Sequence, residues 1–121
     1  MRFCVPVPCF FGGMDFCAAI KKVRELGFDA AETYDWKSLD LERVRQTCAE
    51  TGVELLSMCT TEFNMTAPEK RKDWLAGLKE SCGAAQKAGV KRLITQVGQD
   101  TGEERAYQHE SIVSALREAR P

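Results

Sequence analysis

Short apolar-rich runs alternate along the chain with longer segments whose apolar residues recur every three or four positions. The short runs lie at residues 30–34, 55–59 and 92–97, a length typical of single strands. Between them, residues such as Phe16, Ala19, Ile20 and Val23 have the spacing of one helical face. Strands that alternate with amphipathic helices predict an α/β fold built from strand–helix units.

The same junction precedes all three of these runs. Gly27, Gly52 and Gly89 each follow a predicted helix, and a strand begins within a few residues of each glycine. Glycine commonly takes the left-handed conformation that ends a helix. Helices joined to strands by such short loops predict crossover connections and therefore a parallel sheet.

The ends of the other elements follow from local signals. The first strand is predicted from Arg2 to about Phe10, because apolar residues occupy alternate positions there. Helices are expected to begin after Asp15 and after Asp40, and a fourth helix is expected over about residues 103–119. The segment 66–69 has the pattern of a capping box that opens the longest helix.

Composition and charge narrow the function classes. The 121 residues are 44% hydrophobic and 29% charged, and 17 basic residues nearly balance 18 acidic ones. This balance does not favour nucleic-acid binding, which relies on basic patches. No apolar run approaches the ~20 residues that span a bilayer, and no signal segment is recognisable, so we expect no membrane association and a cytoplasmic protein.

The six cysteines form no C-x-x-C motif and are predicted to be small buried hydrophobic residues rather than redox or nucleophilic groups.

The loops that follow the strands are longer and more varied than those that precede them. Because parallel α/β proteins bind ligands at the carboxyl ends of their strands, we take candidate site residues from these positions. Either a ligand role or a packing or salt-bridged role is open for each. Glu32 would orient a polyol and Cys59 would place a small polar group; Phe10 and Trp36 would form apolar walls; the Gln96 amide would bind a hydroxyl or a metal-bound water.

Several segments together resemble a known family. The segment from Glu25 to Glu32, followed by Trp36, resembles the second strand of the sugar isomerase/epimerase superfamily, the xylose isomerase-like TIM barrels. The resemblance continues through residues 75–81 and 91–94. Residues 96–99 and 108–113 look closest to the hydroxypyruvate isomerase-like branch.

This resemblance implies a fold and a cofactor. The chain would be one partial domain over residues 1–121, the (β/α)4 amino-terminal half of a TIM (β/α)8 barrel. It would belong to carbohydrate metabolism and use a divalent metal, Mg, Mn or Zn, to stabilise an enediolate while two glutamates transfer a proton. The family takes its metal ligands from strands five to eight, so none is carried over to this chain, and no catalytic residue is assigned.

Two functions follow as hypotheses. The chain is the amino-terminal half of a metal-dependent sugar or hydroxypyruvate isomerase or epimerase, inactive alone, with a small hydroxy-carbonyl or sugar substrate. Alternatively, it is a non-catalytic α/β module for assembly or ligand binding. The junction of glycine and strand is not repeated after the fourth helix. We therefore expect an incomplete barrel that self-associates or pairs with a carboxyl-terminal half-barrel.

Overall fold

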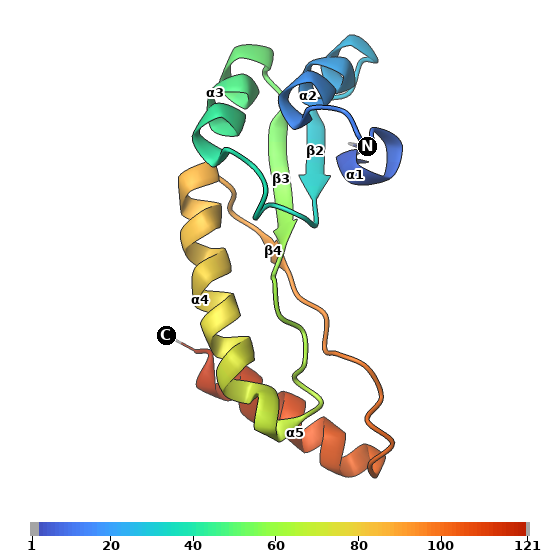
Figure 1. The fold of residues 1–121 in the computed structure, drawn as a ribbon, viewed down its shortest axis with the longest axis vertical. Helices are drawn as coiled ribbons and strands as arrows, with labels where there is room; N and C mark the ends of the chain where they lie inside the picture. Colours follow the sequence, from blue (N-terminus) through green and yellow to red (C-terminus); the bar gives the residue numbers. More distant parts are fainter. Residues whose placement is uncertain (1–2, 121) are drawn as a thin grey trace. The chain divides into compact units, whose positions relative to one another are not determined.

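The computed structural model describes residues 3–120, which form four strands and their intervening helices (Figure 1). The elements are β1 (Val5–Pro6), α1 (Val7–Phe10), α2 (Phe16–Glu25), β2 (Ala30–Thr33), α3 (Leu41–Thr51), β3 (Glu54–Cys59), the 3-10 turn η1 (Pro68–Lys70), α4 (Arg71–Ala88), β4 (Leu93–Ile94) and α5 (Arg105–Glu118). They form two compact units. The first contains the described residues up to Cys59 together with Cys82–Ile94, and the second contains Thr60–Ser81 and the described residues from Thr95 onward.

All four strands belong to the first unit and form one parallel sheet. Their order is β1-β2-β3-β4, so strands that are consecutive in the chain are neighbours in the sheet. Val5 pairs with Ala31, Ala31 pairs with Leu55, and Met58 pairs with Leu93. The predicted α/β fold of four parallel strand–helix units is therefore confirmed.

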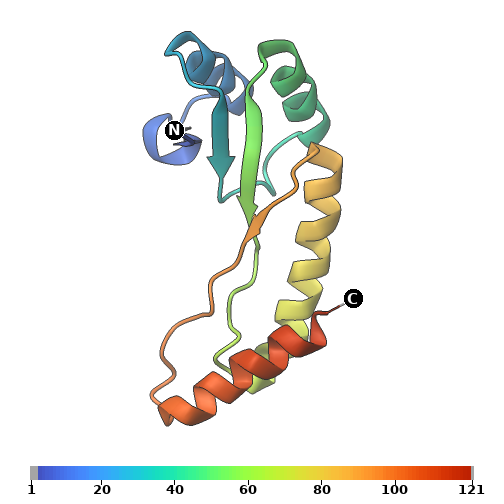
Figure 2. The same cartoon turned by 180° about the vertical axis from the view of Figure 1, so that it is seen from behind.

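Helices cover one face of this sheet. The strand residues Ala31, Leu55 and Met58 pack in one buried cluster with Ile20 of α2 and Val44 of α3, and the last turns of α4 join the same cluster. Figures 1 and 2 both show α2 and α3 side by side next to β2 and β3. The helical stripes predicted from the sequence thus bury one face of the sheet and leave the other without a helix of this cluster.

The predicted glycine junctions are also confirmed. Gly27, Gly52 and Gly89 have φ angles of 88°, 71° and 75°. At Gly52 the main-chain N–H donates a hydrogen bond to the carbonyl oxygen of Cys48 and closes α3. The chain then reverses into β3 within two residues, which explains the short loops between helix and strand.

The first strand is much shorter than the predicted span from Arg2 to Phe10, of which Arg2 lies outside the described residues. Only Val5–Pro6 is a strand, and Val7–Phe10 is a helical turn. Pro8 stands in the first turn of that helix, where proline needs no N–H partner and its fixed φ suits helical geometry. The alternation of apolar residues was therefore misleading here.

The fourth strand is shorter than predicted, and the expected capping box is not formed. Beyond Ile94 the chain leaves the sheet, and the carbonyl oxygen of Val97 accepts hydrogen bonds from the N–H groups of Met65 and Thr66. The Thr66 hydroxyl donates to the carbonyl oxygen of Gln99 over 2.8 Å rather than capping a helix. The longest helix instead starts through η1. These contacts between two loops are long-range, so a local motif does not reveal them.

The second unit has a small core of its own. Met65, Trp74 and Ala115 are buried together, and Leu78 and Ile112 pack against them. The side chains come from the first turns of α4, from α5 and from the loop after β3. This core fixes the loop, because the buried hydroxyl of Ser111 donates to the Met65 carbonyl oxygen over 2.7 Å.

The cysteines are all free, and their burial varies. Cys17 is buried, Cys4, Cys48 and Cys59 are half-buried, and Cys9 and Cys82 are exposed. The prediction that every cysteine is buried is therefore wrong for Cys9 and Cys82. Cys9 lies in the helical turn α1 instead of the predicted strand, and its side chain is exposed there.

Candidate functional site

Glu32 is a charged residue of β2, one of the two inner strands of the sheet. It follows Ala31 in β2, and Ala31 belongs to the cluster beneath the helices. Because consecutive strand residues point to opposite faces, Glu32 lies on the face away from that cluster, near the carboxyl end of its strand. Its side chain is half-buried. A carboxylate at this place is available to a ligand above the strand ends.

Ser57 of β3 fixes this carboxylate. Its hydroxyl donates a hydrogen bond to Oε2 of Glu32 over 3.0 Å, and only 5% of Ser57 is exposed. The pairing depends on an irregularity in the ladder, because the register shifts between Ala31 and Glu32 and brings Ser57 opposite Glu32. A regular ladder would have brought Leu56 to that position. The bulge thus supplies a hydroxyl where a leucine would otherwise lie.

Cys59 extends the same side of β3. It lies two residues beyond Ser57, which is the repeat of one strand face. Burial raises the pKa of the Cys59 thiol, and the negative charge of Glu32 raises it further. The thiol therefore stays protonated at neutral pH, which suits a small polar contact and not a thiolate nucleophile. Glu32, Ser57 and Cys59 together form what we call the strand-end cluster.

Trp36 supports this cluster from the side of the helices. Its indole Nε1 donates a hydrogen bond to the carbonyl oxygen of Cys59 over 2.9 Å, and only 6% of the residue is exposed. The ring packs in the core of the first unit. Trp36 therefore ties the loop after β2 to the last residue of β3.

The remaining two candidates, Phe10 and Gln96, are not members of the strand-end cluster as defined here. Phe10 lies in α1, is 72% exposed, and lines an apolar hollow together with Val5 and Phe28, among others. Gln96 is exposed and belongs to the irregular segment after β4, in the second unit. Conversely, Ser57 was missed by the sequence reasoning. The available signal was a single hydroxyl residue within the apolar run of β3.

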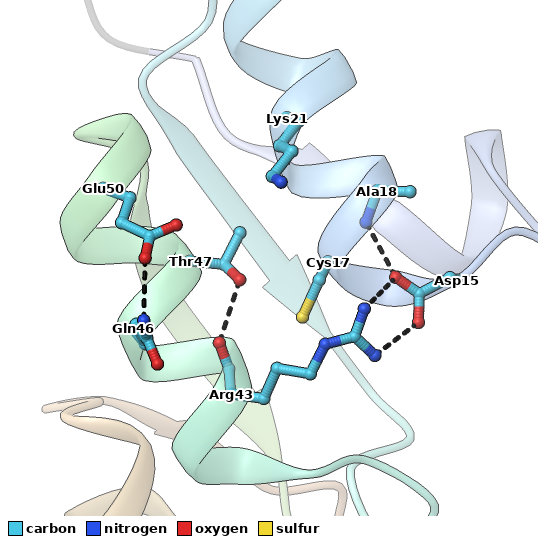
Figure 3. Close-up of a pocket in the computed structure, with 8 residues that line it drawn as sticks. All are labelled: Asp15, Cys17, Ala18, Lys21, Arg43, Gln46, Thr47 and Glu50. Carbon is cyan, nitrogen blue, oxygen red and sulfur yellow. Dashed lines mark hydrogen bonds and ion pairs between the residues drawn. The ribbon is translucent and has the colours of Figure 1, made fainter.

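A polar groove lies between α2 and α3 in the first unit (Figure 3). Arg43 donates two hydrogen bonds to the carboxylate of Asp15, at 3.0 and 3.1 Å, and Asp15 also accepts from the N–H of Ala18. The N–H of Ala18 and the Arg43 guanidinium hold the pKa of Asp15 below its usual value. Gln46 donates to Glu50 over 2.8 Å. These side chains form hydrogen bonds with one another, and the ion pair between Asp15 and Arg43 joins the start of α2 to α3.

The described residues offer little to a metal ion. Across residues 3–120 no three His, Cys, Asp or Glu side chains come together in a geometry that could hold one. The strand-end cluster contributes a single carboxylate, whereas Mg, Mn and Zn sites use several ligands. The same residues contain no helix long and apolar enough to cross a membrane.

The fold and the cluster define the class of protein: a parallel α/β half-barrel with polar side chains at its strand ends. A model of the family described as xylose isomerase-like TIM barrel matches residues 20–121. The chain belongs to this family, which confirms the resemblance to the xylose isomerase-like TIM barrels. A comparison with curated proteins finds no match.

Solved structures support the same fold. An AP endonuclease of family 2 from Brucella melitensis superposes with a TM-score of 0.88 at 13% identity, over 98% of this chain and 49% of that one. A 3-keto-D-glucoside 4-epimerase from E. coli gives 0.79 at 17% identity, over 97% and 50%. A fusion of a xylose isomerase-like TIM barrel with a 4-hydroxyphenylpyruvate dioxygenase gives 0.74 at 15% identity, over 98% and 20%.

The chain thus spans about half the length of the first two structures that it matches. The four strand–helix units correspond to half of a TIM barrel, as the sequence predicted. At these identities the structures establish the fold alone.

Proposed function

We propose that this chain is the amino-terminal half of a metal-dependent isomerase or epimerase that acts on a sugar or on a small hydroxy-carbonyl compound such as hydroxypyruvate. The observation that carries the proposal is the Glu32 carboxylate, held by Ser57 on the face of the sheet away from the helical core. The family and the epimerase among the similar structures support it.

The chemistry of such substrates explains the role of Glu32. Aldose–ketose interconversion moves a proton between two adjacent carbons that carry a hydroxyl and a carbonyl group, so the enzyme must hold the hydroxyl groups in a fixed direction. A carboxylate accepts hydrogen bonds from hydroxyl groups strongly, because the acceptor is charged. Ser57 donates to Oε2, and the proposal assigns the hydroxyl group of the ligand to Oε1. In this proposal Glu32 binds and orients the substrate and does not transfer the proton.

Cys59 completes the contact. Since its thiol stays protonated, it presents a weak donor and an apolar surface to the carbon chain of the ligand. The described residues do not fit a divalent-metal site. We therefore assign the ligands of a Mg, Mn or Zn ion, and the residues that move the proton, to the other half of a barrel, and we expect this chain to be inactive alone.

A ligand pair that differs by one hydroxyl group tests the proposal. Hydroxypyruvate has the hydroxyl and carbonyl groups on adjacent carbons, whereas pyruvate lacks the hydroxyl. We expect hydroxypyruvate to shift the amide resonances of Glu32, Ser57 and Cys59 in an NMR titration of the chain. Pyruvate, at the same concentration, should leave them in place.

The two ligands share a carboxylate and a ketone, so pyruvate controls for charge and for general binding. Equal shifts with both would show that the hydroxyl is not recognised. Shifts confined to the groove around Arg43 would locate the anion elsewhere and contradict the proposal.

A further inference from the structure

Tyr34 lies directly beyond the end of β2, two residues after Glu32. Thr33, which separates them, is only 2% exposed and pairs with Met58 of the buried cluster beneath the helices. Because side chains alternate between the two faces of a strand, the alternation places Tyr34 on the face that carries Glu32. Tyr34 is 54% exposed, so a ligand on that face has access to its ring.

Two hydrogen bonds fix the backbone on either side of Tyr34. On one side, the Thr33 hydroxyl donates to the carbonyl oxygen of Asp35 over 2.9 Å. On the other, the indole of the buried Trp36 donates to the carbonyl oxygen of Cys59 over 2.9 Å. The tyrosine therefore projects from a short segment that is anchored at both ends within the first unit. An aromatic side chain on such a support loses little conformational entropy when it binds a ligand.

The spacing of Glu32 and Tyr34 suits a ligand longer than three carbons. Two residues of a strand span about 6.6 Å. With C–C bonds of about 1.5 Å, three carbons in an extended chain cover about 2.5 Å, whereas five cover about 5 Å. A three-carbon ligand held by Glu32 therefore stops short of the tyrosine, and a chain of five or six carbons extends to it.

We propose that Tyr34 sets the preferred length of the ligand. Glu32 binds the end that carries the adjacent hydroxyl and carbonyl groups, and the ring of Tyr34 packs against the far carbons of a polyhydroxylated chain. An aromatic ring offers an apolar face to C–H groups, and the phenol hydroxyl both donates and accepts hydrogen bonds. One tyrosine thus matches the mixed surface of such a chain. This role rests on the proposed function, because Glu32 supplies the other contact.

Two neutral ketoses test this role. Dihydroxyacetone and D-ribulose both begin with a hydroxyl group next to a carbonyl group, but the first has three carbons and the second has five. We expect the chain to bind D-ribulose more tightly in NMR titrations. Tyr34→Ala should raise the dissociation constant for D-ribulose at least about threefold, since an aromatic contact is lost, and leave that for dihydroxyacetone unchanged. Tyr34→Phe keeps the ring and should retain most of the affinity.

Tyr107→Ala is the matched control, because Tyr107 is 53% exposed on α5 and should change neither constant. Unchanged D-ribulose binding in Tyr34→Ala, together with weaker binding of both ketoses in Glu32→Gln, would overturn the role of Tyr34 and leave the proposed function standing. Equally weakened binding of both ketoses in Tyr34→Ala would also overturn it, since this would indicate a structural effect. Unchanged binding of both ketoses in Glu32→Gln would instead contradict the proposed function, and the role of Tyr34 with it.

Discussion

The indole Nε1 of Trp36 donates a hydrogen bond over 2.9 Å to the main-chain carbonyl oxygen of Cys59. The two residues are 23 positions apart in the sequence, and the bond joins the loop after β2 to the end of β3. Because Trp36 is buried, the carbonyl group would have little access to water if this donor were lost.

We expect Trp36→Phe to lower the free energy of unfolding by about 2 kcal/mol, since it removes the donor and leaves a shielded acceptor unsatisfied. Urea denaturation followed by circular dichroism measures the loss. Trp74→Phe is the matched control. Trp74 is equally buried, but its Nε1 lies 3.4 Å from Oγ1 of Thr95, beyond the usual hydrogen-bond length. If both variants lose the same free energy, the bond to Cys59 is not the cause.

The sequence was a good guide wherever structure depends on neighbouring residues. Asp15 and Asp40 begin α2 and α3 as predicted, and each carboxylate accepts a hydrogen bond from a main-chain N–H three residues later. The three junction glycines were recognisable for the same reason, because a helix end is a local event.

A pair of glycines in the first unit separates two effects of the same substitution. We expect Gly52→Ala to cost about 1 kcal/mol, since its φ of 71° strains any residue with a Cβ, while the space around it is open. Gly83→Ala, in the interior of α4 with equally open surroundings, should instead stabilise by about 0.5–1 kcal/mol. Chemical denaturation of both variants checks the two signs. A loss at both positions would point to steric contacts and not to backbone conformation.

The contact between Asp15 and Arg43 predicts a dependence of stability on pH. The pKa of Asp15 lies below its usual 3.8 in the folded protein, because the N–H of Ala18 and then Arg43 favour the carboxylate. Its contribution to stability is therefore fully present above the pKa of the unfolded chain, and is lost as the pH falls through the folded pKa.

We accordingly expect Asp15→Ala to unfold at lower urea concentration than the wild type at pH 7, and the difference to shrink as the pH falls below 3.8. Asp15→Asn keeps an acceptor for the N–H of Ala18 but loses the charge, so it should recover part of the stability. A difference that does not change with pH would mean that the ionised form of Asp15 contributes nothing.

The pH dependence of Cys59 alkylation tests the electrostatic effect of Glu32 on this thiol. Burial and the charge of Glu32 raise the pKa of the Cys59 thiol, so its alkylation by iodoacetamide should require a higher pH than alkylation of a free thiol. We expect Glu32→Gln to move the alkylation profile of Cys59 to lower pH, since one cause of the raised pKa is removed. Mass spectrometry of labelled peptides gives the Cys59 profile of the wild type and of the variant. An unchanged Cys59 profile would contradict the electrostatic contact.

The parts of the site that the sequence did not reveal depend on register and on distant contacts. Ser57 faces Glu32 because the ladder shifts by one residue between β2 and β3, and a shift of this kind leaves no local signature. Gln96 was expected at the end of a strand, but the chain had already turned at Ile94 to bond with the loop around Met65. The identity of neighbours across a sheet is a tertiary property, whereas caps and turns are local.

Affinity for hydroxypyruvate tests the central claim most directly. We expect the chain to bind it in a saturable NMR titration. Glu32→Gln should raise the dissociation constant about tenfold, the value of one hydrogen bond to a charged acceptor. The control is Glu42→Gln, an exposed glutamate on α3 that should leave the constant unchanged. Equal binding by the wild type and both variants, or no saturable binding at all, would contradict the account of Glu32 as the residue that orients the substrate.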